Sequence, residues 1–216
     1  MNPTDTDIAA LVCSRVCHDL ISPVGAIANG MEVLEEESDA EMREHALELL
    51  GASAAQAGAR LQFARLAFGA AGGIGAEISL EDAGEAARRL FRFLKADLDW
   101  RAERIAVDQD AARLLLNLVH MAGDALPRGG TVTADCRKSP EGVEIEVTGS
   151  GGKVYLQPEH MRLLREGGGG EALDARLIQP WFAHALAERH GARIEGAQGE
   201  DMLTFRVRMR DAHTVP

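Results

Sequence analysis

The chain has 216 residues, of which 46% are hydrophobic and only 4% aromatic, and its formal net charge is −11. This length and hydrophobic content predict a folded protein of two domains. The acidic charge, with Lys and Arg scattered along the chain, argues against nucleic acid as a partner. The polar N-terminus is unlike a signal peptide and no long apolar run stands out, so we expect no membrane span and a cytoplasmic, reduced protein.

Residues 10–34 carry the hydrophobic pattern of a long amphipathic helix. Apolar side chains recur in alternating steps of three and four residues, at Ala10, Cys13, Cys17, Leu20, Val24, Ile27, Met31 and Leu34. This spacing is the a/d heptad seam of coiled coils and helical bundles. Pro23 lacks the amide hydrogen that a helix interior requires, so we expect the helix to bend at this point.

A second seam of the same kind follows, and an acidic segment separates the two. Its members are Leu47, Leu50, Ala54, Ala57, Leu61, Ala64 and Phe68. Ser38 or Asp39 is a candidate N-cap for this second helix. Residues 1–71 are therefore predicted to form an antiparallel helical hairpin. Because two helices enclose no core, we expect a second copy of the chain to complete a dimeric four-helix bundle.

The pattern changes after a glycine-rich linker, and residues 76–216 are predicted to form an α+β domain with a mostly antiparallel sheet. Helices are expected at 81–95, 111–126 and 173–190. Strands are expected at 78–80, 131–137, 143–148, 193–197 and 203–210, with a glycine-rich connection from 149 to 170.

The most informative residues lie within the first helix, where His18 is followed by Asp19 and, five positions on, by Pro23. His18 comes one position after a seam residue, so we expect it to lie beside the seam and to be open to solvent. A lone helical histidine is most often a plain surface residue, but this context indicates a nucleophile. We predict His18 and Asp19 as the catalytic pair, with Asp19 orienting the imidazole.

Four further residues lie within about one helical turn of His18 and are candidates to contact a partner protein: Ser14, Arg15, Ile21 and Ser22. The alternative for these four is plain solvated surface. Cys13 and Cys17 lie close to His18, but a zinc site would need a fourth ligand and none is evident. We therefore predict no metal site and no bound cofactor.

Three segments resemble histidine kinases, in the order in which kinases carry them. The run His18-Asp19-Leu20-Ile21-Ser22-Pro23 resembles the phospho-acceptor box H-[DE]-L-x-[TSN]-P. The stretch 115–132 resembles the N-box of the kinase ATP-binding domain and the turn beyond it, and 186–194 resembles that domain's last helix and strand. The resemblance implies a dimerising hairpin followed by an α/β sandwich like the kinase ATP-binding domain.

The chain departs from the kinase pattern at the nucleotide-binding positions. Met121 replaces the second Asn of the N-box, which holds Mg²⁺ in a kinase, and a thioether is a poor Mg²⁺ ligand. In the next box Gly149 replaces the Asp that binds adenine, and Lys153 replaces a Gly. The run 167–170 has acidic neighbours that would repel a triphosphate, so we interpret it as a flexible loop.

A phospho-acceptor hairpin with a degenerate nucleotide domain is similar to the ChpT-type histidine phosphotransferases. This resemblance implies a homodimer that shuttles a phosphoryl group through His18, from the receiver domain of a hybrid histidine kinase to response-regulator receiver aspartates. It also implies that the receiver, not this chain, supplies Mg²⁺. Two alternatives remain: an ATP-dependent histidine kinase with atypical boxes, and a non-catalytic scaffold that docks receiver domains.

Overall fold

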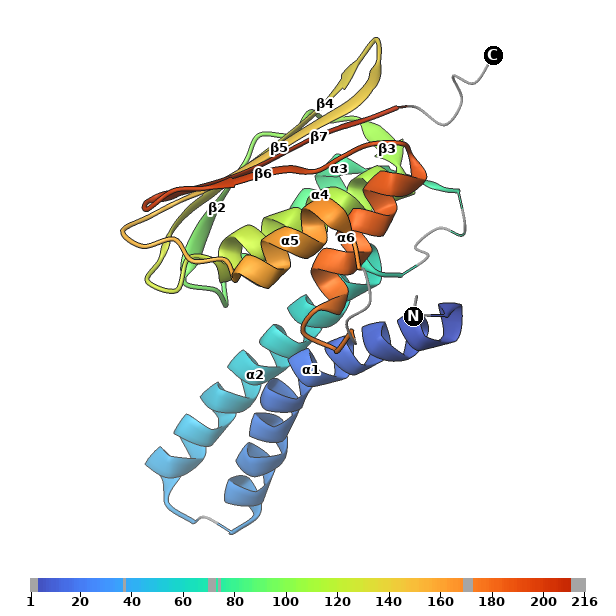
Figure 1. Ribbon diagram of the computed structural model, residues 1–216. Coiled ribbons are helices and arrows are strands. Elements are labelled where there is room, and N and C mark those ends of the chain that lie inside the picture. Colours follow the sequence, from blue (N-terminus) through green and yellow to red (C-terminus); the bar gives the residue numbers. More distant parts are fainter. Residues whose placement is uncertain (1–3, 37, 70–72, 74, 169–172, 211–216) are drawn as a thin grey trace.

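The computed structural model describes residues 4–36, 38–69, 73, 75–168 and 173–210. A helical hairpin lies against the helical side of an α/β sandwich, and the sheet forms the opposite side of the molecule (Figure 1). The predicted fold class, an α+β chain with an N-terminal hairpin and a C-terminal sandwich, is therefore confirmed. The predictions for the linker fall mostly on residues 70–72 and 74, which lie outside the described residues.

The hairpin consists of α1 (Asp5–Glu36) and α2 (Ala40–Ala67). Asp39 caps α2, because its carboxylate accepts hydrogen bonds from the amides of Glu41 and Met42. Pro23 lies inside α1, and Figure 1 shows this helix bending along its length. The predicted hairpin, its cap and its bend are thus all present.

The main sheet has five strands in the order β2-β4-β5-β7-β6. Their bounds are β2 (Ala96–Trp100), β4 (Gly130–Ser139), β5 (Gly142–Ser150), β6 (Glu195–Gln198) and β7 (Met202–Met209). Only β2 pairs in parallel, with β4. A small second sheet joins β1 (Glu77–Ser79) to β3 (Ala106–Asp108). The sequence did not reveal β2 and β3, because both are short and β2 carries two acidic residues that obscure any hydrophobic pattern.

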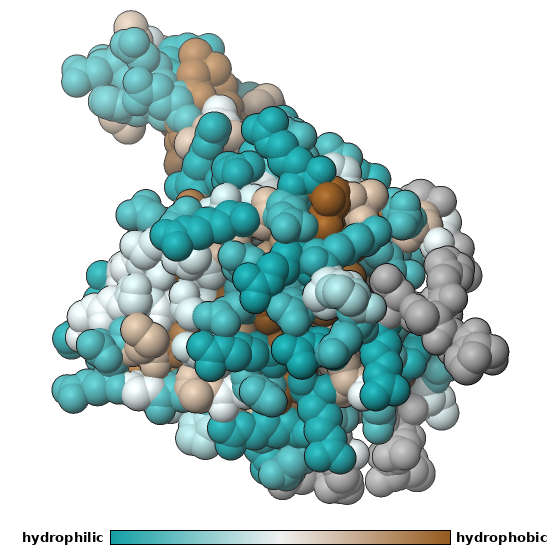
Figure 2. All heavy atoms as spheres, turned by 90° about the horizontal axis from the view of Figure 1, so that it is seen from above, coloured by the Kyte–Doolittle hydropathy of each residue, from teal (hydrophilic) through white to brown (hydrophobic). Residues whose placement is uncertain are grey.

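Four helices cover one face of the main sheet: α3 (Leu80–Phe91), α4 (Gln109–Asp124), α5 (Pro158–Glu166) and α6 (Ile178–Arg189). The helix α4 is buried along almost its whole length, as its apolar sequence predicts. The other face of the sheet is open. Figure 2, which looks down on it, shows a surface made largely of hydrophilic residues.

Three helix predictions need correction. The segment 149–170 was expected to be a connection, but it contains α5, which begins at Pro158 and ends where Gly167 adopts a φ of +69°. The helix α6 begins at Ile178 rather than at 173, because the Asp174 carboxylate accepts backbone hydrogen bonds that hold a separate turn before it. The helix α3 ends at Phe91 rather than at 95.

The hairpin is fixed to the sandwich at the C-terminal end of α2. Phe63, Leu66 and Ala67 belong to the same buried core cluster as α3 and α4. The Asn117 amide of α4 donates a hydrogen bond of 3.0 Å to the carbonyl of Ala67. The Arg113 guanidinium donates one from Nε, also 3.0 Å long, to the carbonyl of Gly69. Packing and hydrogen bonds therefore both set the position of the hairpin.

Candidate functional site

His18 lies on the exposed side of α1, with 80% of its side chain accessible. The accessibility predicted for it from the heptad seam is therefore confirmed. Ser14, Ile21 and Ser22 are also exposed, and they lie three or four positions from His18, so they share its helical face. Ile21 is 69% exposed.

Asp19 holds the imidazole of His18 from one side. His18 Nδ1 lies 3.3 Å from Asp19 Oδ1. A carboxylate only accepts hydrogen bonds, so this contact places the ring proton on Nδ1. Nε2 then keeps its lone pair on an exposed ring, which is the state that a nucleophilic histidine needs.

Arg15 completes this group but faces the protein rather than solvent. Its Nε donates a hydrogen bond of 3.1 Å to Asp19 Oδ2, and only 17% of its side chain is exposed. Its Nη2 lies 3.9 Å from Oδ2 of Asp124, at the end of α4. Of the four residues proposed to contact a partner, Arg15 is thus the one already engaged within the chain.

Residues of the sandwich that no sequence pattern indicated also approach this group. Asp124 Oδ2 lies 3.9 Å from His120 Nε2. Gln179 Nε2 lies 3.0 Å from His120 Nδ1, and an amide nitrogen can only donate, so the His120 proton is on Nε2, toward Asp124. The Gln179–His120 contact joins α6 to α4 and the Arg15–Asp124 contact joins α1 to α4, so no local spacing could have revealed this arrangement.

The positions that bind nucleotide in a kinase have other contacts in this chain. Met121 is 3% exposed, and the Asn117 amide is bonded to the backbone of α2 and α4. Gly149 lies in β5 so close to α4 that a Cβ there would be 3.5 Å from the carbonyl of Ala122. Gly167 is buried against His184, unlike the loose loop we expected, while Gly169 and Gly170 lie outside the described residues.

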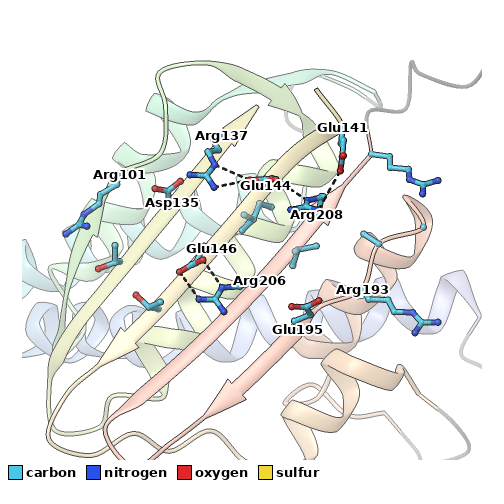
Figure 3. A pocket seen from close by; sticks show the side chains of 17 residues that line it. Arg101, Asp135, Arg137, Glu141, Glu144, Glu146, Arg193, Glu195, Arg206 and Arg208 are labelled. Carbon is cyan, nitrogen blue, oxygen red and sulfur yellow. Dashed lines mark hydrogen bonds and ion pairs between the residues drawn. The ribbon is translucent and has the colours of Figure 1, made fainter. Parts of the chain in front are cut away.

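The open face of the sheet carries a second group of charged residues, over a hollow shown in Figure 3. Arg137 on β4 and Arg208 on β7 both bond Glu144 on β5, each at 3.0 Å. Arg206 bonds Glu146 at 2.8 Å. These are directly opposed cross-strand pairs, and the hydrogen bonds from Arg137 and Arg206 lower the pKa values of Glu144 and Glu146. Each of these five side chains is paired, so we assign these pairs a structural role.

Asp108, Asp110 and His190 also bring ligand atoms within 4.8 Å of one another. Asp110, however, is bonded to Arg113 at 3.1 Å and to Arg189 at 2.9 Å, and Asp108 caps α4. Two arginines at one carboxylate oppose a cation there. This cluster ties α4 to α6 and does not point to a metal.

Two features of α1 bear on what its sequence predicts. Cys13 and Cys17, which lie on the predicted seam, are exposed in the single chain. By length and composition α1 also qualifies as a helix that can cross a membrane, with an 18-residue window of mean hydropathy 1.3 that is only 6% buried. Core helices of soluble proteins pass the same test, so this is weak evidence against the expectation that the chain has no membrane span.

Comparison with known proteins shows the family of the chain. The family model described as the histidine phosphotransferase C-terminal domain matches residues 80–202. The protein phosphotransferase ChpT of Brucella abortus (strain 2308) is 39% identical over 198 residues, covering 91% of this chain and 93% of that protein. A solved structure of a bacterial phosphotransferase is 36% identical, with a TM-score of 0.86 over 96% of this chain and 98% of that one. The chain therefore belongs to the ChpT-type histidine phosphotransferase family.

Proposed function

We propose that this chain is a phosphorelay carrier that takes a phosphoryl group onto His18 Nε2 from the receiver domain of a hybrid histidine kinase. It then passes the group to the receiver aspartates of response regulators. The observation that carries the proposal is an 80% exposed histidine whose Nδ1 is held by a carboxylate at 3.3 Å. The family membership, and the phosphotransferases to which the chain is similar, support it.

The transfer needs no group beyond these residues and the receiver's own site. The Nε2 lone pair attacks the phosphorus of the aspartyl phosphate in line, the P–O bond breaks, and its electron pair returns to the receiver carboxylate. The ring keeps its proton on Nδ1 and becomes positively charged, and the Asp19 carboxylate stabilises that charge. Attack by the next receiver's aspartate reverses the step. We assign Mg²⁺ to the receiver.

We infer that the chain does not use ATP, which disfavours the alternative of an atypical kinase. Met121 cannot replace the Mg²⁺-binding Asn of the N-box. Asn117, the Asn that this stretch does retain, donates its amide hydrogens to the carbonyls of Ala67 and Arg113. No group that would bind the adenine amine stands at Gly149. A hairpin that is fixed to the sandwich is consistent with a histidine that receives its phosphoryl group from another protein.

We also infer that the working form is a homodimer, because the hairpin exposes two apolar stripes. Ala10, Cys17, Val24 and Met31 of α1 are exposed at intervals of seven residues. On α2 the same is true of Leu47, Ala54 and Leu61, of which Leu47 and Leu61 are 59% and 55% exposed. A seven-residue repeat matches the seam of packed helices. A second hairpin of the same kind would cover both stripes, and this also explains why α1 is so apolar.

These elements divide the work between the two parts of the chain. We assign dimerisation and phosphotransfer to residues 1–71, and support of that hairpin to residues 76–216. Ser14, Ile21 and Ser22 are our candidates to contact the receiver, because they surround His18 on its exposed face. A cytoplasmic location fits receiver partners.

The test follows the phosphoryl group. The purified chain is incubated with a labelled phosphorylated receiver, and acid-labile label is measured on the chain. Wild type should gain label and His18→Gln should gain none, while His45→Gln, an exposed histidine of α2, should behave as wild type. His18→Gln should keep the wild-type melting temperature, because the side chain is mostly exposed. Label on His18→Gln would refute the acceptor, and an unlabelled wild type that binds receivers would favour the scaffold.

A further inference from the structure

The acceptor histidine is connected to the sandwich by a chain of charged contacts. His18 Nδ1 faces Asp19 Oδ1 at 3.3 Å, and Asp19 Oδ2 accepts from Arg15 Nε at 3.1 Å. Arg15 Nη2 lies 3.9 Å from Asp124 Oδ2. One guanidinium thus lies between a carboxylate of the hairpin and a carboxylate of the sandwich.

The last carboxylate in this series of contacts, in the sandwich, lies beside buried groups. Asp124 has His120 Nε2 at 3.9 Å, and His120 and Gln179 are 8% and 2% exposed. The His120 ring also packs on Phe63 of α2, with ring centroids 5.3 Å apart. Asp124 itself is half-exposed, and it lies at ion-pair distance from both the fixed His120 ring and the Arg15 guanidinium.

We propose that Asp124, acting through Arg15, is a positioning residue for phosphoryl transfer at His18, an inference that rests on the proposed function. Asp124 restrains the Arg15 guanidinium, Arg15 restrains Asp19, and Asp19 then holds the imidazole with its proton on Nδ1 and its lone pair on Nε2. Without this restraint the Asp19 carboxylate is free to rotate away from the ring. A neutral imidazole in water populates both tautomers, and only one of them presents Nε2 as a nucleophile.

Transfer kinetics test this directly. We compare Arg15→Gln, Asp124→Asn and the double variant with Asp97→Asn, which changes an exposed aspartate of β2 outside this chain of contacts. Arg15→Gln and Asp124→Asn should lower kcat for acceptance from a phosphorylated receiver roughly 5- to 30-fold, with KM within about twofold of wild type. The double variant should be no slower than Arg15→Gln, because Asp124 acts through Arg15. Wild-type kcat in Asp124→Asn, or additive losses, would overturn the inference.

The tautomer provides a second readout that a loss of stability would not reproduce. Nitrogen NMR of histidine-labelled protein should show His18 protonated on Nδ1 in wild type and in Asp97→Asn. In Arg15→Gln and Asp124→Asn it should show a shift toward the Nε2-protonated form, at an unchanged melting temperature. An unchanged tautomer in both variants would overturn the inference while leaving the function intact. If the wild-type chain takes no label on His18, the function fails, and the NMR result still reports separately on positioning.

Discussion

Asn117 offers the sharpest test of how the sandwich holds the hairpin. The residue is completely buried, and its Nδ2 donates to the carbonyls of Ala67, at 3.0 Å, and of Arg113, at 2.9 Å. Asn117→Ala removes both hydrogen bonds and leaves the Ala67 carbonyl, in the last turn of α2, without this donor. Each bond contributes about 0.5–1.5 kcal/mol, and a buried carbonyl without a partner costs about 1–3 kcal/mol.

One effect of the Asn117→Ala substitution stabilises the variant instead. Asn117 Oδ1 is buried without a hydrogen-bond partner, and the substitution by Ala removes that cost. We therefore expect a net loss of about 2 kcal/mol, near the lower end of the sum. Asn117→Asp should cost more, because it places a carboxylate against two carbonyl oxygens.

Urea unfolding at a fixed protein concentration measures the effect. With a slope of about 2 kcal/mol/M, the Asn117→Ala midpoint should fall by about 1 M. Asn29→Ala, which changes an exposed asparagine of α1, should remain within about 0.5 kcal/mol of wild type. A shift for Asn117→Ala as small as that of the control would refute the role of this side chain as a clamp.

Three further predictions concern nucleotide, assembly and pH. Calorimetry should detect no ATP binding up to millimolar nucleotide, and label incorporated from ATP would instead support the kinase alternative. Light scattering should give about twice the 23.2 kDa chain mass. Val24→Asp should halve this measured mass, whereas Met202→Asp, at an equally exposed position in the sandwich, should leave it unchanged. A monomeric wild type would refute the bundle. Burial is the main effect that lowers the pKa of the His160 imidazole, and the charge of Arg15 lowers it further. Three carboxylates oppose this shift: Glu159, Asp124 and Asp174. The unfolded chain therefore binds more protons, so wild type should lose stability relative to His160→Gln as pH falls from about 7 to 5, and parallel curves would contradict this.

The sequence predicted the features that depend on local pattern. The seam, the Asp39 cap and Pro23 sufficed for the hairpin, and the position of His18 beside the seam sufficed for its exposure. The helix α5 was missed because it is only nine residues long and is followed at once by a run of glycines, which dominate the composition of that segment. Asp124 and His120 were missed because their roles arise only when α4 packs against the hairpin, which no spacing along the chain records.

The contacts of α4 give the sandwich a structural role in a chain that departs from the kinase pattern at Met121, Gly149 and Lys153. Four residues on one stripe of this helix, in steps of four, three and four, all reach the hairpin: Arg113, Asn117, His120 and Asp124. Arg113 and Asn117 bond the backbone at the end of α2, His120 packs on Phe63, and Asp124 faces Arg15. In a kinase this same N-box helix would hold Mg²⁺ and nucleotide. A carrier that receives its phosphoryl group from another protein has no need to bring a nucleotide to its histidine, so the stripe is free to fix the hairpin in place.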